Sequence, residues 1–151
     1  MRRIAACLII ALCLGGHVAW AQSAGEQLLA ALEHYRQAVL ELDIEREVSS
    51  FTEDAELSLG SEPVVQGRTT IRSLLTAPSA GKVVAYDLHA AATRVLGSTA
   101  IQNGVYSQRT ISAEHRSSFE KGMFEVQWAR QPDGTWLISR LHTEPVELST
   151  T

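Results

Sequence analysis

Tyr35 and the histidines are the residues of this chain whose types could carry acid–base chemistry. A tyrosine can donate a hydrogen bond to a carbonyl oxygen, but with an ordinary pKa of about 10 it does not take a proton from carbon at neutral pH. The base would then be a histidine, and we expect His89, within a strand, or His142, at the end of the last strand. The alternative for each histidine is an ordinary solvated side chain.

The spacing of the histidines does not indicate a metal centre. No two of them stand four apart in a helical segment or two apart in a strand, which are the spacings that common zinc sites use. The chain also has no serine-triad motif, phosphate-binding loop or nucleotide fingerprint. We therefore expect neither a metal nor a cofactor.

Apolar residues of the expected first helix and last strands predict either a solid core or the wall of a small-molecule pocket. Tyr35 fits both, because a buried core tyrosine with a satisfied hydroxyl is common. In a hollow fold the two interpretations overlap, since the wall of the core is also the wall of the pocket. The expected ligand-binding residues are Leu32, Tyr35, Val39, Phe51, Phe124, Val126 and Trp128.

The range Lys121 to Pro145 is typical of a long antiparallel hairpin, which would position much of that wall. Its turn is Pro132-Asp133-Gly134, a combination that favours a tight reversal of the chain. If Arg130 pairs with Thr135, the alternation of a strand sorts the residues of the hairpin onto two faces. The apolar face then contains Phe124, Val126, Trp128, Leu137 and Leu141.

The same register predicts Trp136 and Ile138 on the outer face of the hairpin, beside Glu125 and Arg140. Large apolar side chains on an exposed sheet face suggest a partner, and a second copy related by a two-fold axis is the simplest one. We therefore expect a homodimer through this face. The alternative is that another element of the same chain covers these two residues.

Residues 1–21 have the pattern of a cleaved secretory signal peptide. A basic start and an apolar run ending at Leu14 precede Ala19-Trp20-Ala21, which fits cleavage before Gln22. The apolar run is shorter than the roughly 20 residues that span a bilayer, so export is favoured over a membrane anchor. We expect a periplasmic or secreted protein with one domain over residues 22–151.

Cleavage would change the composition of the chain. It would remove both cysteines, together with Arg2 and Arg3, and leave 11 basic residues against 17 acidic ones, a net charge of −6. The mature chain would then have no disulfide and no thiol ligand. An acidic chain without a basic stripe is a poor match for nucleic acids or anionic membranes. A small neutral or cationic ligand, or another protein, fits it better.

Periodicity predicts three helices followed by a sheet. An apolar stripe over Gly25 to Leu42 predicts a long first helix, and Ile44, Val48 and Phe51 mark a short second one. A third is expected over Thr69 to Leu75. From Lys82 onward the apolar period becomes two, which is typical of antiparallel strands. Such an order predicts an α+β domain whose sheet buries one face against the helices.

Four runs of the chain resemble the nuclear transport factor 2-like superfamily, and more narrowly its SnoaL-like and ketosteroid-isomerase-like members. They lie at residues 35–39 (YRQAV), 50–57 (SFTEDAEL), 65–71 (VQGRTTI) and 128–136 (WARQPDGTW). The resemblance implies a cone-shaped, curved antiparallel sheet wrapped around a long N-terminal helix, with two further short helices, in the manner of a cystatin-like or SnoaL-like roll. It also implies a conical pocket that some members use for catalysis.

The resemblance carries a role for Tyr35 only. Ketosteroid isomerases use a first-helix tyrosine to stabilise an oxyanion, beside a protonated carboxylic acid and a carboxylate base. Tyr35 falls where that tyrosine lies in the family. The base would fall near Ser58 to Gly60 and the second donor near Phe124, and neither position has a carboxyl group.

Two hypotheses follow for the function. The first is a non-catalytic domain of the cell envelope that binds a small apolar molecule in its pocket. The second is a lyase or isomerase in which Tyr35 polarises a carbonyl and His142 or His89 is the base. The first is favoured, because the sequence supplies no complete catalytic set, and whether the chain is an enzyme stays open at this point.

Overall fold

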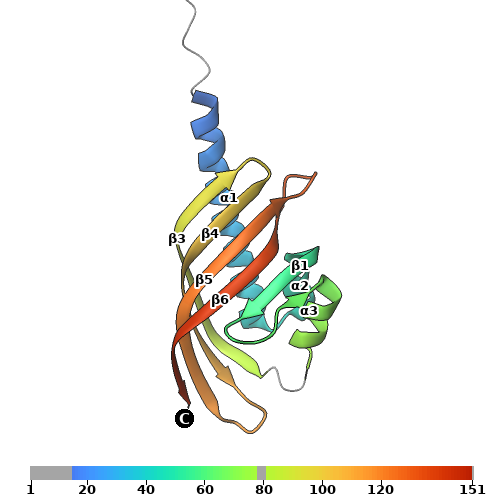
Figure 1. Ribbon diagram of the computed structural model, residues 1–151, viewed down its shortest axis with the longest axis vertical. Coiled ribbons are helices and arrows are strands. Elements are labelled where there is room, and N and C mark those ends of the chain that lie inside the picture. The colour runs from blue at the N-terminus through green and yellow to red at the C-terminus, as the bar shows by residue number, and fades with distance from the viewer. Residues whose placement is uncertain (1–14, 78–80, 151) are drawn as a thin grey trace, which may run out of the picture.

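The computed structural model describes residues 15–77 and 81–150 and builds them into one curved sheet with three helices on its concave side (Figure 1). The elements are α1 (Gly15–Glu41), α2 (Ile44–Ser49), β1 (Phe51–Leu59), β2 (Val65–Gln66), α3 (Arg68–Leu75), β3 (Lys82–Leu96), β4 (Thr99–Ile111), β5 (Ser117–Arg130) and β6 (Trp136–Thr150). The strand order is β2-β1-β6-β5-β4-β3. Neighbouring strands are antiparallel, except that β1 and β6 run parallel, so the sheet is mixed. The predicted α+β fold, a curved sheet around a long first helix, is confirmed.

Helix α1 packs its apolar stripe against the sheet. Leu28, Leu32, Tyr35 and Val39 are all buried, as the four-three-four spacing predicts. The helix ends at Leu42, which has a φ of 56°, in the left-handed region that favours glycine. The amide of Leu42 bonds to the carbonyl of Val39, and that of Asp43 bonds to the carbonyl of Ala38, which is the Schellman pattern. Leu42 is therefore an exposed end of the helix rather than part of its buried stripe.

The turn after α1 directs helix α2 toward the core. The Asp43 side chain accepts a hydrogen bond from the Arg46 amide and so caps the N-terminus of α2. The helix is shorter than the sequence predicts, because Phe51 belongs to β1, where it is fully buried. The six residues that remain in α2 are enough to bury Glu47 and Val48.

The β5–β6 hairpin has a different register from the predicted one. Arg130 pairs with Trp136 rather than Thr135, and an irregularity between Gln127 and Trp128 shifts the pairing by one further residue. Beyond it Val126 lies opposite Leu141. The row of Phe124, Val126 and Trp128 is nevertheless buried, because the face of β5 follows from its own alternation and not from its partner.

The corrected register reverses the expectation for Trp136 and Ile138. Both are buried, with 6% and 0% of their surface exposed, and the Trp136 indole donates a hydrogen bond to the Gln27 side chain of α1 at 3.2 Å. They therefore contribute to the core and cannot form an outer dimer patch. The alternative, that the chain itself covers them, is the correct one, because the turn is one residue longer than predicted and so moves both residues to the α1 side of β6.

The curvature of the sheet comes from bulges and from two glycines in its strands (Figure 1). The β3–β4 pairing shifts near Ala90, and the β5–β6 pairing shifts at Gly122. A side-chain carbon added at Gly104 would lie 1.9 Å from the His89 carbonyl oxygen, and one at Gly122 would lie 2.1 Å from that of Glu144. Backbones can approach this closely only at glycine. The resulting bend is what separates the sheet from α1 at one end.

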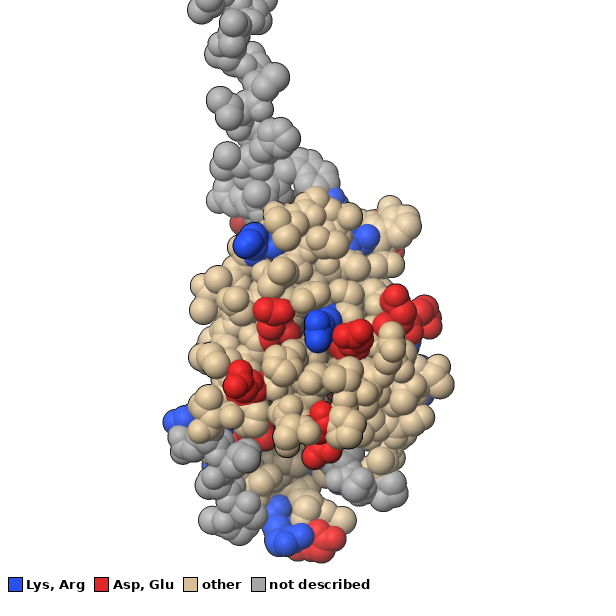
Figure 2. Space-filling view, in the orientation of Figure 1, with Lys and Arg blue, Asp and Glu red and all other residues tan. Residues whose placement is uncertain are grey.

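The predicted signal peptide lies mostly outside the described residues, because only 15–21 are described, as the first turns of α1. Its cleavage stays a prediction. Within the described chain, no helix is both long and apolar enough to cross a membrane. On the face seen in Figure 2, the Lys and Arg side chains are scattered among acidic ones and form no continuous stripe.

Candidate functional site

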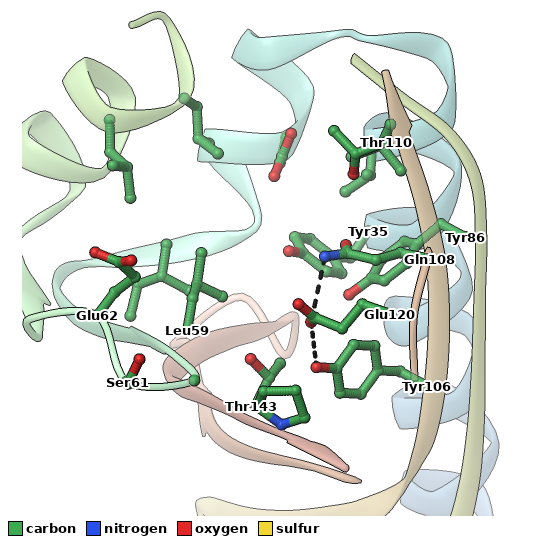
Figure 3. A pocket seen from close by; sticks show the side chains of 18 residues that line it. Tyr35, Leu59, Ser61, Glu62, Tyr86, Tyr106, Gln108, Thr110, Glu120 and Thr143 are labelled. Atoms are coloured by element: carbon green, nitrogen blue, oxygen red, sulfur yellow. Dashed lines mark hydrogen bonds between the residues drawn. The ribbon is translucent and has the colours of Figure 1, made fainter. Parts of the chain in front are cut away.

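A cavity of about 410 Å³ lies where the curved strands part from the C-terminal half of α1. Its apolar lining includes Val39, Leu57, Leu59, Leu74, Leu75 and Val83. Its hydrogen-bonding side chains include Tyr35, Glu47, Tyr86, Tyr106, Gln108 and Glu120 (Figure 3). Cavities of this size, mostly apolar and with a few converging polar groups, are the usual form of a small-molecule site.

Two of the seven expected ligand-binding residues, Tyr35 and Val39, line this cavity. The others are closely packed core residues outside its lining, namely Leu32, Phe51, Phe124, Val126 and Trp128. The bond between Trp136 and Gln27 joins this end of the hairpin to the N-terminal half of α1. The cavity lies about two to three helical turns further along α1, at Tyr35 and Val39.

The two histidines expected as bases do not line the cavity. His142 pairs with Ser58 in the β1–β6 ladder, and its Nδ1 lies 3.2 Å from the Ser58 hydroxyl oxygen. Their strand neighbours Leu57 and Thr143 do line the cavity, so alternation turns His142 and Ser58 to the opposite face. His89 is exposed, and it alternates in the same way with the buried Tyr86 and half-buried Leu88 of β3.

Glu47 is the acid–base residue that the sequence analysis missed. Only 6% of its surface is exposed, and it lines the cavity from α2. Burial raises the pKa of its carboxyl group from 4.5 to about 7. Among the described residues, no side chain forms a hydrogen bond or ion pair with this carboxylate. The signal was its place in the helical pattern, since Glu47 occupies the same face as Ile44, Val48 and Phe51.

Three buried tyrosines converge on the same space. The ring of Tyr35 meets that of Phe51 edge-on at 5.7 Å between centroids, and that of Tyr86 at 6.4 Å. Burial raises the pKa of the Tyr35 phenol well above 10, and the nearby Tyr86 and Glu47 raise it further. Burial likewise raises the pKa of Tyr86 and of Tyr106. All three phenols therefore stay protonated at any physiological pH.

Glu120 of β5 is held on one side of the cavity (Figure 3). Its Oε1 atom accepts a hydrogen bond from the Tyr106 hydroxyl and a longer one, 3.4 Å, from the Gln108 amide. Both bonds use the same oxygen, so Oε2 can still accept a bond from a ligand. Leu59, the last residue of β1, and Glu62, in the segment that follows it, lie across the space from Glu120. Among the described residues, no three His, Cys, Asp or Glu side chains are grouped so as to hold a metal ion.

The site thus offers protonated phenols and the carboxyl group of Glu47, which titrates near neutral pH. It also offers the carboxylate of Glu120, one oxygen of which already accepts two hydrogen bonds. Apolar side chains form much of the remaining lining. Such a set can bind a donor-bearing ligand, or can hold a carbonyl at Tyr35 while Glu47 exchanges a proton. Sequence patterns identified Tyr35 only. The other polar members come from four separate elements that meet only in the folded chain.

Searches by sequence and by structure give different results for this chain. No protein-family model matches it, and no curated protein matches it. Solved structures match it well, and the three described below are 13–15% identical to it. A nuclear transport factor 2-like superfamily protein from Salmonella enterica serovar Typhimurium has a TM-score of 0.72 at 13% identity, with 83% of this chain and 92% of that chain covered.

Two further solved structures are similar. The type 3 hexachlorocyclohexane dehydrochlorinase from Novosphingobium barchaimii has a TM-score of 0.70 at 14% identity, covering 87% of this chain and 92% of that one. A ketosteroid isomerase-like protein from Erwinia carotovora atroseptica has a TM-score of 0.68 at 15% identity, covering 78% and 92%. At these identities the likeness establishes the fold, and function has to be argued from the site.

Proposed function

We propose that this chain, which has the nuclear transport factor 2-like fold, binds a small and mainly apolar molecule in the cavity beside Tyr35 and Glu47. The observation that carries the proposal is the buried Glu47 carboxyl group, which has no hydrogen-bond partner among the described residues and lines a cavity of ligand size. The Glu47 oxygens are not among the fully enclosed side-chain atoms that lack a partner in the described chain, so they face the cavity space, where a ligand can bond to them.

A neutral fluorescent probe, N-phenylnaphthylamine, tests the proposal. We expect saturable binding at one site per chain, which Val39→Trp abolishes by filling the cavity. Leu29→Trp is the matched control, because Leu29 lies on the exposed side of the same helix and its replacement should leave binding unchanged. Binding that persists in the Val39 variant, or no saturable binding at all, would reject the cavity as the ligand site.

A second candidate, proton-transfer catalysis, is favoured by one specific observation. Glu47, whose pKa of about 7 suits a general base, lines the same cavity as the protonated Tyr35. In this reading Tyr35 would hold a substrate carbonyl and Glu47, rather than His142 or His89, would take the proton from the adjacent carbon. A dehydrochlorinase and a ketosteroid isomerase-like protein have the same fold, which supports the class but not the substrate.

The catalytic reading is tested by proton exchange. An aryl ketone incubated with the protein in heavy water should lose its α-protons faster than in buffer, as followed by NMR. Glu47→Gln should abolish the acceleration, and Glu26→Gln, an exposed acid far along α1, should not. Equal exchange with wild type and with the Glu47 variant would leave binding as the only proposed role.

Export and dimerisation belong to the same proposal. The leader supports a periplasmic or secreted location, and a mature protein that begins at Gln22 by intact-mass measurement would bear it out.

A homodimer would have to use outer-face residues other than Trp136 and Ile138. Val105 and Met123 are neighbours across β4 and β5 and are 53% and 50% exposed, so Met123→Lys should lower the mass seen by light scattering if the dimer forms there.

A further inference from the structure

The charged side chains that line the cavity all have the same sign. Glu47, Glu62 and Glu120 line it, whereas none of its lining residues in the described chain is Lys, Arg or His. The basic residues that adjoin Tyr35 and Glu47 in the sequence are engaged elsewhere, since Arg36 is paired with Glu33 and Arg46 with Glu41. With low-dielectric walls around them, such carboxylates give the cavity a negative potential.

The deepest of the three carboxyl groups has no donor to neutralise it. Glu47 is more than nine-tenths buried, and none of the described residues donates a hydrogen bond to it or pairs with it. Its surroundings are the phenols Tyr35 and Tyr86, whose pKa values its negative charge helps to raise. A ligand that brings its own donors or positive charge would therefore supply the partner that the chain lacks.

The other polar groups of the cavity suit the same kind of ligand. Tyrosine rings attract cations through their negative faces, and three tyrosines line this space. Glu120 keeps Oε2 for a further donor, because Tyr106 and Gln108 both bond to Oε1. Glu62 is exposed and lies on the opposite side of the space from Glu120, so the cavity has a carboxylate on each of these two sides (Figure 3).

From this arrangement we infer that the ligand is an organic ammonium ion: an amine head, bound by Glu47 and the tyrosines, on an apolar body that contacts Val39, Leu57 and Leu75. The inference rests on the proposed function, because it assigns a chemical class to the molecule that this cavity binds. An anionic ligand is disfavoured by three carboxylates, and a neutral one leaves Glu47 without a charge partner.

Three probes with the same phenylbutyl body separate the possibilities. Phenylbutylamine is a cation at pH 8, phenylbutanol is neutral and phenylbutanoate is an anion, and their binding is measured by calorimetry with the full-length mature protein. We expect the amine to bind at least tenfold more tightly than the alcohol, and the carboxylate to bind too weakly to measure.

Variants locate the amine head. Glu47→Gln should weaken amine binding at least tenfold and leave alcohol binding within about twofold. Glu120→Gln is a second and independent variant, with a smaller expected loss, in case the first fails to fold. Glu26→Gln makes the same change in net charge outside the cavity and should change neither affinity, which excludes a general effect of protein charge.

Each outcome has one meaning. Alcohol or carboxylate binding as tight as that of the amine, with Val39→Trp abolishing it, would overturn the ammonium class and leave the cavity as a binding site. Amine binding that survives both glutamate substitutions would overturn it as well. No binding of any of the three probes, nor of N-phenylnaphthylamine, would overturn the proposed function itself.

Discussion

Tyr106 lies opposite Gly122 in the β4–β5 ladder, and its hydroxyl reaches past that glycine to the carboxylate of Glu120, two residues along β5. Tyr106 is 3% exposed and Glu120 is half-buried, so the bond is partly shielded from water and lies in the wall of the cavity.

Removal of this bond should be measurable. Tyr106→Phe should lower the free energy of unfolding by about 1–2 kcal/mol, because a hydrogen bond to a charged acceptor is lost. Urea unfolding measures the change, and a double-mutant cycle with Glu120→Ala isolates the pair. If the Phe substitution costs as much without Glu120 as with it, the bond does not contribute.

Glu47 makes the stability of the protein depend on pH. The folded pKa of about 7 exceeds the unfolded value near 4.5, so the folded state keeps a proton that the unfolded state has lost. Stability should therefore fall as pH rises from about 4.5 to 7, by roughly 3 kcal/mol at most. Tyr35 and Tyr86, which interact with Glu47, remain protonated throughout this window.

The variant Glu47→Gln removes this dependence. At pH 8 it should be more stable than wild type, whereas at pH 4.5 the two should agree within about 1 kcal/mol. Urea midpoints across pH 4.5–8 give the comparison, with Glu26→Gln as the control that should follow wild type. A wild type that gains stability relative to the Glu47 variant over that range would contradict the burial of this carboxyl group.

Gly122 should not tolerate a side chain. In Gly122→Ala the added carbon would lie 2.1 Å from the Glu144 carbonyl oxygen, which the backbone must move to avoid. We expect a loss of about 1–3 kcal/mol of stability. Gly25→Ala is the matched control: nothing lies within 4 Å of its added carbon, so it should not destabilise the protein. Thermal melts should show a lower midpoint for the Gly122 variant only.

Replacement of Leu42 by glycine is expected to raise the stability of the protein. The φ of 56° at this position costs a side-chain-bearing residue about 1–2 kcal/mol, and Leu42 is 45% exposed, so little burial is lost on replacement. Glycine loses more conformational entropy on folding, which offsets part of this gain. Leu42→Gly should therefore raise the free energy of unfolding by about 0.5–1 kcal/mol. Leu29→Gly, an exposed leucine inside α1, should instead lose about 1 kcal/mol. A destabilised Leu42 variant would show that this side chain contributes more than its exposure suggests.

The local pattern of apolar residues was sufficient to predict α1 and β5 and the faces that these two elements bury. The α1 stripe through Tyr35 and the β5 row through Phe124 and Trp128 depend only on the period of their own segment, and both are buried. The pairing of β6 was not within reach of the pattern, because the length of the turn and the irregularity at Gln127 are properties of two strands together. The turn, which pairs Arg130 with Trp136, changed the faces of Trp136 and Ile138.

The apolar periods of the chain alone determined that a sheet buries one face against a long helix, and the resemblance to the nuclear transport factor 2-like superfamily implied that this sheet curves around it. Only the tertiary structure decided where the hollow lies and which side chains enter it. Glu47, Tyr86, Tyr106 and Glu120 come from four elements, and their meeting depends on a bend set by Gly104 and Gly122. Burial, which raises the Glu47 pKa, is likewise a property of all the surrounding elements and cannot be found in the six residues of α2.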